Sequence, residues 1–256
     1  MPEFKWRDCN IAKTKAKNLQ NRFVHAYFDI VYNPTYDFAT ARLISYRKLL
    51  QTCISKLRLS DNDRVLCVGL GTGNEIVYLL EQNKHVDIVG VDLSKNALKK
   101  SHEKASALHK GIELMVMDVH RLEFSDNSFD KVICLHVMDF LDDITKTTYE
   151  IIRVLKEGGE FLITYPSQIE SQRLGLNILR DSINHKLSMG TNRIRAFLES
   201  ISQLSACIIY LPLMLRSRKI VTREELTRLI SELSSNFNIE EYPAYCDYIV
   251  YGSKST

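Results

Sequence analysis

The run from Val65 to Glu75 constrains this chain more than any other part of the sequence. It reads as a buried strand, a glycine-rich turn and the start of a helix, with Gly69, Gly71 and Gly73 at alternate positions of the turn. Glycine lets a backbone turn tightly and approach a ligand closely. The run therefore predicts a ligand-binding loop at the end of the first strand of an α/β sheet.

The spacing of these glycines argues against two common ligands. The dinucleotide fingerprint G-x-G-x-x-G would place its third glycine at Asn74, whereas here it comes one residue earlier, at Gly73. The turn also lacks the Gly-Lys-Ser/Thr ending of a phosphate-binding P-loop. NAD and nucleoside triphosphates are therefore disfavoured.

Short apolar runs alternate with helical patterns from the start of this run to about residue 165. The expected strands lie at 64–68, 87–91, 114–117, 131–135 and 160–165, and the expected helices at 74–83, 95–109 and 143–156. This alternation is typical of parallel crossovers and of a sheet covered on both faces. It predicts a doubly wound, Rossmann-like α/β domain.

Helical patterns flank this core on both sides. Residues 1–60 form an N-terminal helical segment with one apolar face between Leu43 and Leu57, and residues 168–220 form a helical insertion after the fifth strand. Thr222 and Glu225 predict a capping box for a further helix, and two expected strands, 237–242 and 248–251, close the chain. We expect residues 61–256 to form one domain.

Composition and charge narrow the class of protein. The chain has 256 residues, of which 45% are hydrophobic, and a formal net charge of +3, so it can bury a core and shows no overall basic excess. Residues 61–167 carry 12 basic against 18 acidic side chains, and residues 1–60 carry 11 against 4. The suspected core is thus acidic, and a basic segment precedes it.

Cysteine spacing and hydropathy exclude further classes. The six cysteines form no CxxC pair, which disfavours a zinc or dithiol motif, and free thiols are expected. Residues 1–20 lack the apolar segment of a secretory signal, and no apolar run reaches the roughly 18 residues of a membrane span. We expect a cytoplasmic protein, with membrane association as an alternative.

Two carboxylates end consecutive strands beyond the glycine loop. Asp92 lies about 20 residues after the loop, where an acid can accept hydrogen bonds from both ribose hydroxyls; its other interpretation is a cap for the next helix. Asp118 ends the following strand and could accept a hydrogen bond from an adenine amino group, or be an ordinary surface acid.

The order of these elements resembles the class I S-adenosylmethionine-dependent methyltransferases, and within them the broad group that includes the ubiquinone and menaquinone C-methyltransferases. The resemblance covers about residues 60–165 and continues more weakly from Thr222 to the end. Its motifs are V-G-L-G-T-G at 68–73, G-V-D-L-S at 90–94, L-E-F-S-D-N-S-F-D at 122–130 and E-I-I-R-V-L-K-E-G-G-E at 150–160.

The resemblance implies a seven-stranded sheet whose last strand, 247–251, is antiparallel, and S-adenosyl-L-methionine as cofactor, with S-adenosyl-L-homocysteine as product. The implied cofactor-binding residues are Gly69, Gly71 and Gly73 at the methionine part, Asp92 and Leu93 at the ribose, Asp118 and Val119 at the adenine, and Leu135. One departure matters: family members usually have an acid two residues before the first glycine, where this chain has Cys67.

The acceptor side is less defined by the sequence. The resemblance places His136 beside the acceptor, where its imidazole could act as a general base; alternatively it binds only water or backbone, since positioning alone can drive methyl transfer. The predicted pocket residues are Tyr27, Tyr32, Tyr36 and Met138. The tyrosines belong to an aromatic segment that would close over the acceptor as a lid, or simply pack on the domain.

The sequence thus predicts direct in-line methyl transfer to a small, lipophilic or aromatic organic acceptor, without a metal ion. The insertion would line the acceptor pocket. Its apolar run 206–215, followed by basic residues up to 219, could instead contact a membrane surface, or pack as a helix against the core or a second copy of the chain. Monomer and homodimer both stay open. Two alternatives remain: an RNA methyltransferase that uses Lys13, Lys15, Lys17 and Arg22, and a non-catalytic binding protein that keeps the fold.

Overall fold

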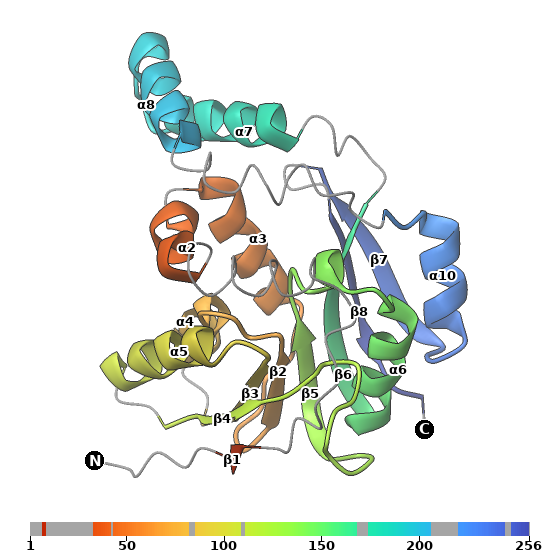
Figure 1. Cartoon of the computed structure of the whole chain (residues 1–256). Helices are drawn as coiled ribbons and strands as arrows, with labels where there is room; N and C mark the ends of the chain where they lie inside the picture. Colours follow the sequence, from red (N-terminus) through yellow and green to blue (C-terminus); the bar gives the residue numbers. More distant parts are fainter. Residues whose placement is uncertain are drawn as a thin grey trace.

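A mixed β-sheet with helices on both faces forms the centre of the molecule (Figure 1). The computed structural model describes residues 7–8, 33–41, 43–81, 85–108, 111–167, 174–205, 220–243 and 247–255. Several predicted features lie outside these residues: Tyr27, Tyr32, the basic residues Lys13, Lys15, Lys17 and Arg22, and the segment 206–219.

Eight strands of the described chain form the sheet. Its strands are β1 (Arg7–Asp8), β2 (Arg64–Val68), β3 (Asp87–Asp92), β4 (Glu113–Val116), β5 (Phe129–Cys134), β6 (Leu155–Pro166), β7 (Asn236–Tyr242) and β8 (Asp247–Ser253), in the spatial order β1-β4-β3-β2-β5-β6-β8-β7. Strands β2 to β6 run parallel, and β8 lies antiparallel between β6 and β7. The seven-stranded sheet with an antiparallel last strand is confirmed, and the two-residue β1 adds an edge that was not predicted.

Two apolar layers hold the helices against the sheet. The helices are α2 (Asn33–Thr40), α3 (Ile44–Ser55), α4 (Asn74–Glu81), α5 (Lys95–Ala107), α6 (Ile144–Val154), α7 (Leu174–Ser188), α8 (Arg193–Ser205) and α10 (Arg223–Ser231), with a 3-10 turn η2 (Met138–Phe140). Side chains of α3, α4 and α5 share one buried cluster, and those of α6 and α10 share the other. Because both faces are covered, the central strands are apolar almost throughout, as in β2.

Helix caps and turns fix the ends of several elements. In α10 the capping box is confirmed: the Glu225 backbone N–H donates to Thr222 Oγ1 at 3.1 Å, and the Thr222 N–H donates to Glu225 Oε2 at 2.9 Å. The predicted boundary between the helix 143–156 and the strand 160–165 is wrong by a few residues. Helix α6 ends at Val154, and β6 begins at once because Leu155 already pairs with Phe129.

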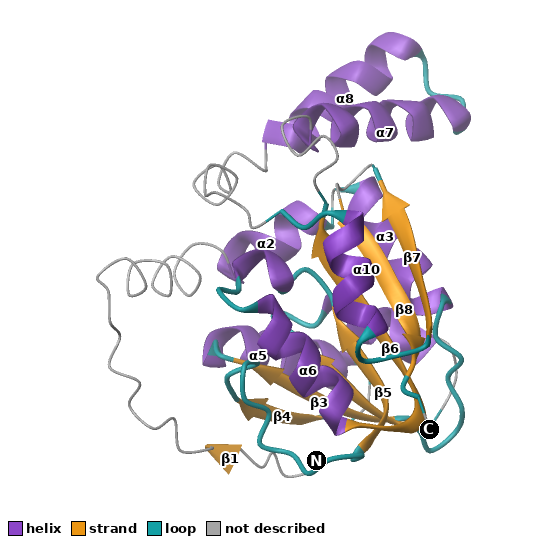
Figure 2. Cartoon of the chain, turned by 90° about the vertical axis from the view of Figure 1, so that its right-hand side faces the viewer, coloured by secondary structure: helices purple, strands orange, loops and turns teal. Residues whose placement is uncertain are grey.

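The insertion after β6 forms a helical hairpin above the carboxyl ends of the parallel strands (Figure 2). Helices α7 and α8 join through Ser182 and Ser200, whose hydroxyl oxygens lie 2.9 Å apart. Helix α7 also contacts α3, where Lys48 lies 3.6 Å from Asp181. Among the helices that the structure describes, none is both long enough and apolar enough to span a bilayer.

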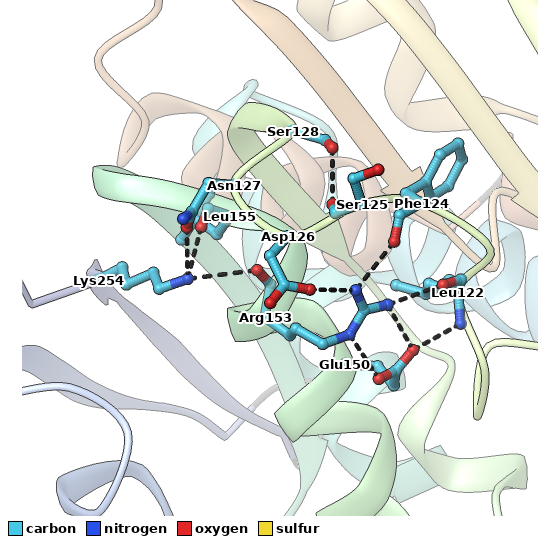
Figure 3. A network of polar contacts seen from close by, with 10 residues as sticks. All are labelled: Leu122, Phe124, Ser125, Asp126, Asn127, Ser128, Glu150, Arg153, Leu155 and Lys254. Carbon is cyan, nitrogen blue, oxygen red and sulfur yellow. Dashed lines mark hydrogen bonds and ion pairs between the residues drawn. The ribbon is translucent and has the colours of Figure 1, made fainter.

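Figure 3 shows why two of the sequence motifs belong together. Arg153 of α6 donates to the backbone oxygens of Leu122 and Phe124 at 2.8 and 2.9 Å, and its guanidinium also contacts Asp126 at 2.7 Å and Glu150 at 2.8 Å. A planar guanidinium suits this fixed fork of acceptors. The motif on α6 therefore anchors the loop of residues 122–128 that leads into β5.

We expect Arg153→Ala to lower the free energy of unfolding by about 2 kcal/mol, because it removes the cation from the Glu150 carboxylate and leaves two loop carbonyls without this donor. Urea denaturation measures this loss. The control is Arg195→Ala on α8, whose side chain is 73% exposed and which should leave the unfolding midpoint unchanged. Equal midpoints for wild type and Arg153→Ala would contradict the anchoring role.

Candidate active site

The glycine loop joins β2 to α4 at the carboxyl end of the parallel strands. Gly69, Gly71 and Gly73 all have left-handed backbones, with φ of 66°, 57° and 74°. A Cβ at Gly69 would collide with the Val137 side chain, whereas at Gly71 it would meet only the Gly69 carbonyl oxygen at 3.9 Å. The space beside Gly71 is therefore open, which fits a loop whose backbone a ligand approaches closely.

Asp92 holds this loop in place from the end of β3. Its Oδ2 accepts a hydrogen bond from the Gly71 N–H at 2.9 Å, and its Oδ1 accepts one from the Ser94 N–H at 2.8 Å. The helix-capping interpretation of Asp92 is wrong, because Ser94 is the N-cap of α5 and accepts from the Ala97 N–H at 3.1 Å. The neighbouring Leu93 is 44% exposed, so its apolar side chain can cover a bound ring.

Asp118 follows β4 on the same edge of the sheet. Its Oδ1 accepts hydrogen bonds from the His120 N–H at 2.9 Å and lies 2.8 Å from His120 Nδ1. The hydrogen bond from His120 holds the pKa of Asp118 below its usual value, and the same bond raises the pKa of His120. Val119 is buried. The contact between His120 and Asp118 was not predicted, although the two residues are only two positions apart in the sequence.

His136 stands directly beyond β5 in a strained conformation. Its φ is 57°, a left-handed value that costs a non-glycine residue about 1–2 kcal/mol. Its N–H donates to Thr164 Oγ1 at 2.8 Å, and its Nδ1 lies 3.1 Å from Asp247 Oδ2, whose side chain is fully buried. These contacts fix the imidazole at the carboxyl edge beside Leu135, which is buried.

Sequence analysis did not predict Asp247, because 111 residues separate it from His136. Strand β8 runs antiparallel to β6, with Asp247 opposite Pro166. The first residue of β8 therefore meets the last residues of the parallel strands. The predicted antiparallel direction was the signal that could have placed Asp247 at this edge.

An aromatic pair covers His136 from the N-terminal helices. Tyr36 donates from its hydroxyl to the Tyr46 hydroxyl at 3.0 Å, and the Tyr46 ring centre lies 5.5 Å from that of His136. Burial raises the pKa of Tyr46, so its hydroxyl stays neutral. Of the four predicted pocket residues, Tyr36 lies here, whereas Met138 is fully buried in the core and offers no surface to an acceptor.

A polar network fastens α2 to the glycine loop. The Asp37 carboxylate accepts from the Thr72 hydroxyl at 2.6 Å and from the Lys104 amine at 2.8 Å. The same amine donates to Asn74 Oδ1 at 2.5 Å, and burial lowers the pKa of Lys104. The network joins the N-terminal segment, the loop and α5, so the position of α2 depends on the conformation of the loop.

Glu75, the second residue of α4, is an unusual buried acid. It is 6% exposed. Burial raises the pKa of its carboxyl to about 7, against the smaller opposing effects of its own backbone N–H, Lys104 and His136. The sequence pattern does not distinguish Glu75 from the acids that are common in a first helical turn.

The structure also brings together a set of potential metal ligands. One ligand atom each from His136, Asp139 and Asp247 lies within 4.8 Å of the others. Imidazole and carboxylate groups are ligands of several divalent metals. Sequence spacing does not predict this set, and the His136–Asp247 separation of 3.1 Å is equally that of a direct ion pair.

Comparison with known proteins identifies the domain. Residues 66–163 match the family model described as a methyltransferase domain. A ubiquinone/menaquinone biosynthesis C-methyltransferase of Geobacter sulfurreducens is 30% identical over 166 residues, which cover 62% of this chain and 64% of that protein. Over residues 66–163 this chain is therefore similar to the methyltransferase domain.

Other relatives agree on the fold. Phosphoethanolamine N-methyltransferase 3 of Arabidopsis thaliana is 34% identical over 111 residues, 43% of this chain and 22% of that protein. The structure of phosphoethanolamine N-methyltransferase 2 of Haemonchus contortus with S-adenosyl-L-methionine has a TM-score of 0.59 at 15% identity, over 91% of this chain and 60% of that one. The chain spans less than two thirds of the length of both curated relatives.

We expect Gly71→Ala to weaken the binding of S-adenosylmethionine, because the added methyl group enters the open space beside the loop. The left-handed backbone costs about 1 kcal/mol of stability as well. Gly158→Ala is the matched control, since Gly158 has φ 71° and open space but lies on β6 away from the loop. Calorimetric titration should show a loss of affinity for Gly71→Ala alone; the same affinity in both variants would count against a ligand at Gly71.

Without cofactor, Glu75→Gln should stabilise the protein increasingly as pH rises. The folded pKa is about 7 and the ordinary value is 4.5, so between these values the folded chain retains a proton that the unfolded chain has released. The retained proton stabilises the folded wild-type protein fully below pH 4.5, and this stabilisation is lost as pH rises through about 7. Denaturant melts from about pH 5 to about pH 8 should show a gain of roughly 3 kcal/mol for the variant; a pH-independent difference would contradict the raised pKa.

Proposed function

We propose that this protein transfers the methyl group of S-adenosylmethionine to a small organic acceptor at the carboxyl edge of the sheet. The observation that carries the proposal is the arrangement of two groups on that edge. The loop held by Asp92 lies at the end of β2, and His136 with Asp247 lies beyond the neighbouring β5. In this proposal the donor site and the acceptor site are side by side.

The residues of the donor site fit the cofactor. The carboxylate of Asp92 is at the position to accept from ribose hydroxyls, and the open space at Gly71 admits the methionine part. The apolar side chains of Leu93 and Val119 would contact the adenine ring. An oxygen of Asp118 would accept a hydrogen bond from the adenine amino group. When bound, S-adenosylmethionine supplies an electrophilic methyl group. The protein then accelerates transfer chiefly by holding an acceptor atom about 3 Å away and in line.

His136 is the proposed general base. Its imidazole can take a proton from an acceptor hydroxyl or amine, and the buried Asp247 carboxylate at 3.1 Å stabilises the resulting imidazolium. The strained backbone supports a functional role, because such strain persists where surrounding contacts enforce it. The neutral hydroxyl of Tyr46 beside the ring could orient the acceptor.

A lipophilic or aromatic acceptor suits the surroundings. The rings of Tyr36 and Tyr46 form one wall beside His136. Above them, α8 exposes an apolar face at helical spacing, made of Ile194, Phe197, Leu198 and Ile201. We propose that residues 1–60 act as a lid, which the contacts of Asp37 support, and that the insertion 168–220 contributes to the acceptor pocket and to any contact with a membrane surface.

Release of S-adenosylhomocysteine tests the function directly. The full chain would be incubated with S-adenosylmethionine and a panel of phenols, quinols, amines and carboxylic acids. With an accepted substrate, His136→Asn should lower kcat about 100-fold or more while the dissociation constant for S-adenosylmethionine stays unchanged. The control His85→Asn changes a side chain that is 84% exposed and should behave as wild type.

Two results would contradict the proposal. Binding of S-adenosylmethionine without product from any acceptor class would favour a non-catalytic binding protein. Full activity of His136→Asn would remove the general base and leave positioning alone.

A further inference from the structure

The glycine motif of this chain lacks the acid that precedes it in related methyltransferases. Cys67 occupies the position, two residues before Gly69, where related methyltransferases usually carry an acid. Its side chain is fully buried, and burial raises the pKa of the thiol well above its usual range, with a further contribution from Glu75. Cys67 is therefore neutral and provides no charge to a cationic ligand.

Glu75 is a carboxylate close to the same loop in the sequence. Glu75 begins α4 directly after the loop, and its charge acts on groups from three other elements. Burial raises the pKa of Cys134 on β5 and of Tyr46 on α3, and in each case Glu75 is the next contributor. Cys67 pairs with Ile133, the residue before Cys134. Glu75 is thus a buried acid at the start of the helix that follows the glycine loop, and its charge acts on groups of β2, β5 and α3.

Within the described chain, no Lys, Arg or His forms an ion pair with the Glu75 carboxyl. The charges of Lys104 and His136 lower the pKa of the Glu75 carboxyl, but the Lys104 amine binds Asp37 and Asn74 at 2.8 and 2.5 Å, and His136 Nδ1 lies 3.1 Å from Asp247. A buried carboxylate without a bound cation is costly, and proteins retain one mainly where a charged partner or a ligand offsets that cost. Glu75 is therefore suited to a cationic ligand group.

We propose that Glu75 binds the α-ammonium group of the methionine part of S-adenosylmethionine, in place of the acid that Cys67 replaces. The proposal rests on the cofactor of the proposed function. It makes Glu75 a binding residue rather than a helix-stabilising one. The charge of the motif is thereby moved from the end of β2 to the start of α4, on the other side of the same loop.

Three ligands separate this role from a structural one. S-Adenosylmethionine and S-adenosylhomocysteine carry the ammonium group, whereas 5′-methylthioadenosine keeps the adenosine and lacks the amino acid. Calorimetric titration of the full chain should show that Glu75→Gln weakens the first two by about 10- to 100-fold, as for loss of a charged hydrogen bond. Its affinity for 5′-methylthioadenosine should stay within about twofold of wild type.

Two further variants sharpen the test. Glu81→Gln changes an exposed acid at the other end of α4 and should bind all three ligands as wild type does. In the Glu75→Gln background, Cys67→Asp should restore about tenfold or more of the lost affinity, because it returns the carboxylate to the position that the family uses. Thermal melts establish that each variant is folded.

The outcomes distinguish this inference from the proposed function. If wild type binds S-adenosylmethionine but Glu75→Gln loses no affinity, or loses it equally for 5′-methylthioadenosine, the role of Glu75 is refuted and the function stands. If wild type binds none of the three ligands, both are refuted. Selective loss in Glu75→Gln with rescue by Cys67→Asp supports the inference.

Discussion

The hydrogen bond from the Gly71 N–H to the Asp92 carboxylate is the contact on which the arrangement of the site depends. It joins the loop after β2 to the end of β3 at 2.9 Å. The loop donates this bond from a left-handed backbone at Gly71, a conformation that glycine adopts at little cost. The same carboxylate thereby sets the loop conformation and lies at the point where an adenosyl ribose would be held.

The remaining site residues meet because of the sheet topology. Parallel strands end at one edge, so ligands of open α/β sheets bind there. The antiparallel β8 brings Asp247 to that edge beside His136. From the N-terminal side, Asp37 on α2 binds both the loop and Lys104, so the candidate active site is closed by residues from both ends of the chain.

Local sequence patterns predicted the fold well and the site in part. Strand and helix periodicity is a property of neighbouring residues, so the five parallel strands and the glycine loop were predictable, as was the Thr222 capping box. The contacts of Asp247, Tyr46 and Glu75 depend on strand register and on packing between distant segments, which periodicity does not encode. Met138 was misplaced for the same reason, since the turn η2 directs its side chain into the core.

The central claim is that an adenosyl sulfonium cofactor occupies the crevice between the glycine loop and the end of β3. A crystal structure of the full chain with S-adenosylhomocysteine tests it most directly. The account predicts both ribose hydroxyls on the Asp92 carboxylate and the amino acid part beside Gly71. Density for the ligand at any other place, or a crevice that stays empty at saturating ligand, would contradict it.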